Sequence, residues 1–297
     1  PVINVSDCDE RLLQKYIIEK LNECPTEIVL GPSTVQLINS SYSTEKHFIN
    51  NGVIWASLED YLSIYYLYEK KGCKIRKVLL GLGPWLLNDN SNLNRWKVLE
   101  KEYNIILSKL LNTAVNNPLS GLYQYSKYKE LFSLQYFKLS LISLINVKKG
   151  GVTRLKDGSI CYSAGFLDAD MSEVEKRARH NIGSDLTYAL GNFRHLSKHY
   201  KLLFSNFVEY LQKQNIKVEF YLSPLHPIMY EYLNKNSYYH IVFETENYFK
   251  DYANSHKIQV IGSYNPAKYN FDNSNFLDGW HLKEKAIEKM LNRAIRC

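Results

Sequence analysis

The fold class follows from one stretch of the sequence, Thr26-Glu27-Ile28-Val29-Leu30-Gly31-Pro32-Ser33-Thr34. Its apolar residues form a short run bounded by turn residues, which is typical of a buried strand. Gly31 and Pro32 then predict a tight turn, and the amphipathic spacing from Ser33 to Ile38 predicts a helix. The stretch therefore predicts a strand, a turn and a helix, which is the repeating unit of an α/β fold.

Similar apolar runs recur along the chain and alternate with helical patterns. The pattern predicts that a second strand ends at Asn51–Trp55. Further strands are predicted at Lys77–Leu82, Lys217–Leu222 and Ile258–Gly262. The helical patterns cover Leu12–Leu21, Ser57–Tyr68, Phe193–Gln214, Ile228–Leu233, Glu246–Ser255 and Lys283–Ile295. Alternation of this kind predicts parallel strand pairing with helices on both faces of the sheet. We expect a flavodoxin-like three-layer α/β/α sandwich with a central, mainly parallel sheet.

Residues 90–200 interrupt this rhythm. Helical spacing covers Trp96–Leu111, Glu130–Ile145 and Ser172–Tyr188, and Asp157-Gly158 predicts the turn of a hairpin over Val152–Tyr162. We expect residues 1–297 to form a single domain. In it, residues 90–200 would be a largely helical insertion or cap that shapes the substrate site.

Composition excludes several classes of protein. Apolar residues make up 45% of the 297 residues and charged residues 23%, so a disordered chain is excluded. The formal charge of +7 is spread along the chain and no nucleic-acid motif is present, which favours an ordinary solvated surface. A basic face toward an anionic polymer or a membrane surface is the alternative. No apolar run is long enough for a transmembrane helix, and the start at Pro1 leaves a preceding signal or anchor open.

The cysteines do not predict a metal site, because none forms a CxxC pair. They are Cys8, Cys24, Cys73, Cys161 and Cys297. An odd count argues against a full disulfide framework, so free buried thiols are expected. A single pair, such as Cys8 with Cys24, is the alternative in an oxidising compartment.

The candidate chemistry lies at strand ends, because sites of open parallel sheets form at the carboxyl edge. Ser33 follows the first strand and is a candidate nucleophile. His281 can act as its base, and Asp278, three residues earlier, can fix the imidazole tautomer. Ser33 could instead cap the next helix, and Asp278 and His281 could be loop residues before the last helix. The combination favours a catalytic triad.

These residues resemble motifs of the SGNH/GDSL hydrolase superfamily. Gly31-Pro32-Ser33 stands where that family has Gly-Asp-Ser, and Asp278-Gly279-Trp280-His281 matches its Asp-x-x-His block. The chain is most similar to a bacterial branch found with surface-polysaccharide enzymes. Leu222–Pro227 and Ile261–Pro266 also resemble that branch.

Two positions depart from the family pattern. With Asn50-Asn51-Gly52 aligned to the family's Asn-x-Gly, Trp55 stands where a glycine N–H helps to bind the oxyanion. Gly83 stands where an asparagine side chain donates to it, and losing one such donor typically lowers the rate about 10²–10³-fold. Asn51 or Asn88 could substitute as a donor.

Other residues complete the predicted site. Trp55, Trp85 and Trp280 fall on site loops, where aromatic rings suit sugars but also serve as core. His226 follows a strand end and either lines the cleft or is a turn residue held between prolines.

Two further features have less specific interpretations. His195 and His199 are spaced for a metal on one helix, but no third ligand is evident, which favours a solvated face. The segment Phe132–Ile145 is apolar on most faces and predicts a buried helix. A lid, a dimer face or a membrane contact is the alternative.

The resemblance implies an esterase or O-acyltransferase acting on acyl esters, with acetyl favoured, of a bacterial carbohydrate or polysaccharide. It implies no metal and no cofactor, and a place in the cell envelope or periplasm, with the cytoplasm left open. A catalytically degenerate carbohydrate-binding or assembly protein is the alternative, motivated by Gly83. A DNA- or lipid-surface binder is a third idea that rests only on the charge.

Overall fold

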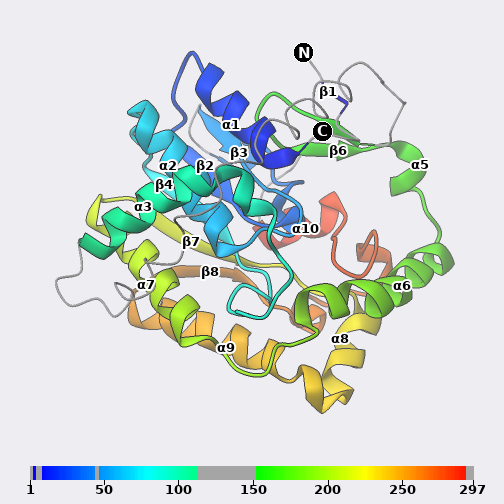
Figure 1. Cartoon of the computed structure of the whole chain (residues 1–297). Coiled ribbons are helices and arrows are strands. Elements are labelled where there is room, and N and C mark those ends of the chain that lie inside the picture. Colours follow the sequence, from blue (N-terminus) through cyan, green and yellow to red (C-terminus); the bar gives the residue numbers. More distant parts are fainter. Residues whose placement is uncertain (1–2, 5–8, 44–46, 113–151, 292–297) are drawn as a thin grey trace.

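The computed structural model describes residues 3–4, 9–43, 47–112 and 152–291. A parallel sheet of five strands lies at the centre (Figure 1), in the order β3-β2-β4-β7-β8. The strands are β2 (Glu27–Leu30), β3 (Phe48–Asn50), β4 (Lys77–Gly81), β7 (Lys217–Leu222) and β8 (Gln259–Gly262). The register places Glu27 beside Lys77 and Leu30 beside Leu80. This order, with its reversal between β2 and β4, is flavodoxin-like and agrees with the predicted fold class.

Helices cover both faces of the sheet, as the alternating pattern predicts. They are α1 (Glu10–Lys20), α2 (Leu58–Lys71), α3 (Glu100–Asn112), α5 (Ala164–Leu167), α6 (Met171–Leu190), α7 (Lys198–Lys213), α8 (Pro227–Lys235), α9 (Ile241–Ser255) and α10 (Glu284–Leu291). Because side chains alternate along a strand, Ile28 and Leu30 face the core under α1, α2, α7 and α9. Val29 faces the opposite core, which α10 closes with Ile287.

A small antiparallel sheet lies beside the main one. It consists of β1 (Ile3–Asn4), β5 (Val152–Arg154) and β6 (Ile160–Tyr162). β5 and β6 form the hairpin predicted from Asp157-Gly158, and Gly158 has a φ of 80°. Asp157 O accepts a hydrogen bond of 2.7 Å from Asn50 N, which attaches the hairpin to the edge strand β3.

Three predicted elements differ from the structure. The segment after Ser33 is not an α-helix but a 3₁₀ helix, Ser33–Val35. At its end, Asn50 Nδ2 donates to both Val35 O and Ile38 O at 2.7 Å, so a side chain satisfies these carbonyls in a turn that does not continue as an α-helix. Residues 51–55 follow β3 as a loop.

The helix predicted over Phe193–Gln214 begins only at Lys198, because Ser197 Oγ caps it by accepting from Tyr200 N. His195 therefore precedes the helix, and His195 and His199 do not share a helical face. The described residues contain no cluster of three or more metal-binding side chains. The predicted helices over Glu130–Ile145 and Phe132–Ile145 lie outside the described residues.

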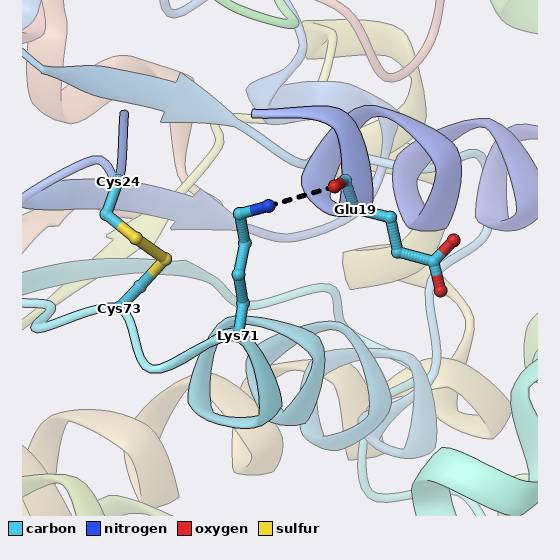
Figure 2. The surroundings of a disulfide bond; sticks show 4 residues. All are labelled: Glu19, Cys24, Lys71 and Cys73. Atoms are coloured by element: carbon cyan, nitrogen blue, oxygen red, sulfur yellow. Dashed lines mark hydrogen bonds between the residues drawn. A yellow bond between two sulfur atoms is a disulfide. The ribbon is translucent and has the colours of Figure 1, made fainter. Parts of the chain in front are cut away.

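The cysteine prediction was wrong. Cys24 and Cys73 form a disulfide with a Cα–Cα distance of 5.3 Å (Figure 2). Cys24 precedes β2 and Cys73 precedes β4, and these neighbouring parallel strands bring their amino ends together. Beside the disulfide, Lys71 Nζ donates to Glu19 O at 2.9 Å. Cys161 is also disulfide-bonded, and Cys8 and Cys297 lie outside the described residues.

None of the helices in residues 9–43, 47–112 and 152–291 is both long and apolar enough to cross a membrane.

Candidate active site

Ser33 lies at the carboxyl end of β2, next to the point where the strand order reverses. Gly31 allows the chain to pass close to β4, since a Cβ there would lie 3.1 Å from Gly81 Cα and 2.9 Å from Val35 Cγ2. Gly31 O also accepts from Val53 N at 3.0 Å, which fixes the turn against the following loop. The turn presents a half-buried Ser33 side chain at this edge of the sheet.

The loop between β8 and α10 brings Asp278 and His281 to Ser33. Asp278 Oδ1 accepts from the backbone N–H groups of Trp280 and His281 at 2.8 and 2.9 Å, so the loop folds around the carboxylate. His281 Nδ1 lies 2.8 Å from Asp278 Oδ2, and His281 Nε2 lies 2.8 Å from Ser33 Oγ. With Nδ1 protonated toward Asp278, Nε2 is left to accept the proton of the Ser33 hydroxyl. The structure thus brings together the residues predicted as nucleophile, base and orienting acid.

Burial and charge act against each other in this pair. Burial raises the pKa of Asp278, but the His281 charge and hydrogen bonds from His281 and Trp280 outweigh it and lower that pKa below its ordinary value. Burial lowers the pKa of His281, but Asp278, with a smaller contribution from Asp185, raises it overall. Both shifts favour an imidazolium paired with a carboxylate, which is the charge state that forms when a histidine takes a proton from serine.

A cavity of about 290 Å³ opens beside Ser33 and His281. One wall is aromatic: the Trp55 ring lies 4.7 Å from the Trp85 ring and 5.8 Å from the Trp280 ring, measured between centroids. All of these predicted tryptophans line the cavity. The hairpin β5–β6 contributes to the lining with Val152, Arg154, Ile160 and Tyr162, and α6 with Asn181 and Asp185. The idea that residues 90–200 shape a substrate site stays a prediction, but part of that segment lines this cavity.

Backbone donors are available next to Ser33. In the described part of the chain, the N–H groups of Ser33 and Trp55 have no hydrogen-bond partner. Trp55 has a φ of 51°, which is rare for a bulky residue. Its turn is held by α1, because Glu10 Oε2 accepts from Ile54 N at 2.5 Å and Arg11 Nη2 donates to Ile54 O at 2.9 Å.

The lack of a side chain at Gly83, where the sequence resemblance leads one to expect an asparagine, has a steric reason. A Cβ on Gly83 would lie 2.8 Å from Trp85 Cε2, so the Trp85 ring fills the space that an asparagine side chain would need. Gly83 itself is not part of the cavity lining. Neither suggested replacement lines it: Asn51 Oδ1 accepts from Tyr68 Oη at 2.9 Å, and Asn88 Nδ2 donates to Ala189 O at 2.8 Å.

His226 lies behind the loop rather than in the cavity. It is fully buried, its Nδ1 accepts from Ile228 N at 3.2 Å as the cap of α8, and its ring packs on Phe276. Burial lowers its pKa to about 4. His226 N also donates to Gly279 O at 3.1 Å, which supports the loop from behind. The sequence predicts that His226 either lines the cleft or is a turn residue, and its position is that of a turn residue.

Sequence reasoning missed several polar residues of the cavity, namely Glu10, Gln36, Arg154, Asn181 and Asp185. Glu10 Oε1 accepts from Gln36 Nε2 at 2.9 Å and from Arg154 Nη2 at 2.8 Å. The predicted hairpin could have pointed to Arg154, because a hairpin inserted into an α/β fold often borders the site. No local pattern marks Glu10 or Asp185, since only the packing of α1 and α6 brings them to the cavity.

Comparison with known proteins gives only distant likeness. No protein-family model matches the chain, and no curated protein matches it in sequence. One similar solved structure is that of a putative acylhydrolase from Bacteroides fragilis NCTC 9343. It has 13% sequence identity and a TM-score of 0.40, and the alignment covers 95% of this chain and 93% of that one.

Proposed function

We propose that this chain is a serine acyl-ester hydrolase or O-acyltransferase of SGNH type. The observation that carries the proposal is the chain of contacts from Asp278 through His281 to Ser33, with 2.8 Å at each step, beside an open cavity. Nucleophile, base and orienting acid in hydrogen-bond sequence are the recognition pattern of acyl-transfer sites.

In the proposed reaction, Ser33 Oγ attacks the ester carbonyl as its proton moves to His281 Nε2. The carbonyl oxygen takes the negative charge, and the N–H groups of Ser33 and Trp55 are the donors proposed to hold it. When the tetrahedral intermediate collapses, the C–O bond of the leaving group breaks and His281 returns the proton to the departing alkoxide. Water or another hydroxyl then takes the acyl group from Ser33, with His281 again acting as base.

The substrate we propose is an acyl ester, with acetyl favoured, of a bacterial carbohydrate. The tryptophan wall supports this, because flat aromatic rings pack against sugar rings while the polar residues opposite can bond hydroxyl groups. We place the protein in the cell envelope or periplasm. The Cys24–Cys73 disulfide supports a compartment outside the reducing cytoplasm.

A fluorophosphonate probe tests the nucleophile. We expect stoichiometric labelling of Ser33 in the intact chain, and a loss of labelling and of 4-nitrophenyl acetate turnover by about 10⁴-fold or more in Ser33→Ala. Ser40→Ala, which changes an exposed serine nearby, is the matched control and should label like the unchanged protein. Turnover that survives Ser33→Ala would remove Ser33 from the mechanism. Mass spectrometry of an acetylated glycan then separates acetate release from transfer to a second hydroxyl.

One observation favours a second candidate, a non-catalytic carbohydrate-binding or assembly protein. The Trp85 ring replaces the family's side-chain donor at the oxyanion position, and it extends the aromatic wall. This candidate predicts glycan binding that survives Ser33→Ala and an absence of labelling. Robust labelling at Ser33 excludes it.

A further inference from the structure

Two polar side chains of helix α6 contact the loop that carries Asp278 and His281, at Gly279 and Trp280, and Arg177 of the same helix donates to Leu277 O of that loop at 3.4 Å. Gly279 N donates to Asn181 Oδ1 at 3.0 Å, and Trp280 Nε1 donates to Asp185 Oδ2 at 3.2 Å. Asn181 and Asp185 are four residues apart and share one face of the helix, and Asn181 Nδ2 donates to Asp185 Oδ2 at 2.6 Å. The loop packs closely here, since a Cβ on Gly279 would lie 2.5 Å from Met229 Cε and 3.0 Å from Asn181 Oδ1.

The charged and titratable groups around His281 come from several elements. They are Asp278 of its own loop, Asp185 of α6, Glu10 of α1, Arg154 and Tyr162 of the hairpin, and His226 behind Asp278. Arg177 of α6 also reaches the loop, at Leu277 O, and it pairs with Glu173 at 3.3 Å. Arg154 pairs with Glu10 at 2.8 Å, so the fields of these two groups largely offset each other. Burial raises the pKa of Tyr162, and burial lowers that of His226, so both are neutral near pH 7.

Asp185 is the charge that remains uncompensated in this wall. Its hydrogen-bond partners in the described residues are neutral donors, namely Trp280, Asn181 and Ser184. No lysine or arginine of the described residues forms an ion pair with it. Its side chain is half-buried, so solvent screens it less than a surface carboxylate.

We propose that Asp185 is a positioning residue of this site: it fixes the Trp280 side of the loop, and its charge stabilises His281 in the protonated form that arises when Ser33 attacks. The inference rests on the proposed function. Neighbouring Asn181 supplies an equivalent hydrogen bond to the same loop without a charge, so the two residues separate the mechanical part of the role from the electrostatic part.

The test compares Asp185→Asn with Asn181→Ala. Asp185→Asn keeps an oxygen for Trp280 Nε1 and removes the charge. We expect the acid limb of fluorophosphonate labelling, and the titration of the His281 imidazole in NMR spectra, to move to lower pH by about 0.5 unit. Removing a nearby negative charge disfavours the protonated imidazole and so lowers its pKa, and half a unit is a small shift for such a neighbour. Asn181→Ala should slow labelling without moving the limb.

The proposal is overturned if Asp185→Asn leaves both the acid limb of labelling and the NMR titration of His281 where they are in the unchanged protein. This holds even if the labelling rate falls as it does in Asn181→Ala. The NMR titration reads His281 directly and does not need activity. Failure of the unchanged protein to label would therefore count against the proposed function, while a shifted NMR titration would still support the role of Asp185.

Discussion

The disulfide between Cys24 and Cys73 should stabilise the chain strongly without taking part in its chemistry. The two cysteines are 49 residues apart. In the chain-entropy description, closing a loop of that length lowers the entropy of the unfolded chain by an amount worth about 4 kcal/mol at 25 °C. For a domain of this size, a loss of about 4 kcal/mol lowers the melting temperature by about 6 °C. The perturbation is the pair of changes Cys24→Ser and Cys73→Ser.

Each single variant and the double variant should be melted and unfolded in urea under non-reducing conditions. Either single change breaks the same bond, so each should lose about as much free energy of unfolding as the double variant does. Equal losses would identify the crosslink, and not the packing of each sulfur, as the source of the stability.

Activity gives the second half of this test. The disulfide lies at the amino ends of β2 and β4, whereas Ser33 follows the carboxyl end of β2, so the sheet separates the two. We expect unchanged ester turnover at 20 °C in the double variant. The reasoning fails if the double variant loses less than about 1 kcal/mol, if its loss equals the sum of the single losses, or if turnover falls while the protein is still folded.

Two further predictions concern buried charged and titratable residues. His226 has a folded pKa of about 4 against an ordinary value of 6.5, so the unfolded chain binds the extra proton between these values, and stability present above pH 6.5 is lost as the pH falls toward 4. His226→Asn, which keeps a cap for α8, should reduce this loss of unfolding free energy at acid pH by about 3 kcal/mol. Urea unfolding at pH 7.5 and at pH 4 measures the loss in both proteins. Identical losses would contradict the lowered pKa of His226. Arg11 and Asp60 form a buried ion pair at 2.9 Å, so Arg11→Ala should lower the free energy of unfolding by about 3–5 kcal/mol. Lys235→Ala removes an exposed ion pair, the one with Glu231 on α8, and should leave the free energy of unfolding nearly unchanged; similar losses in the two variants would refute the distinction.

The central sheet and the Ser33, Asp278 and His281 cluster could be predicted because their signals are local. An apolar run such as Ile28–Leu30 needs only its own hydrophobicity to indicate a buried strand. The parallel order then places the ends of β2 and the last loop at one edge. Asp278 and His281 are three residues apart, so one loop fixes their geometry.

The features that could not be predicted depend on partners distant in sequence. The helix expected after Ser33 is replaced by a short 3₁₀ turn, whose last carbonyls accept from the amide of Asn50. The Cys24–Cys73 pairing depends on which strands are neighbours. The glycine at position 83 is explained only by the ring of Trp85, and Asp185 reaches the cavity through the packing of α6.

The separation of 248 positions along the chain between Ser33 and His281 has a consequence for biosynthesis. A chain emerging from the ribosome exposes the serine early, but the histidine that would activate it arrives only after β2, β4, β7 and β8 have been made. A serine hydroxyl without its base is a poor nucleophile. If Ser33 is the nucleophile that we propose, an incomplete chain would hold it without its base until the last loop closes on the finished sheet.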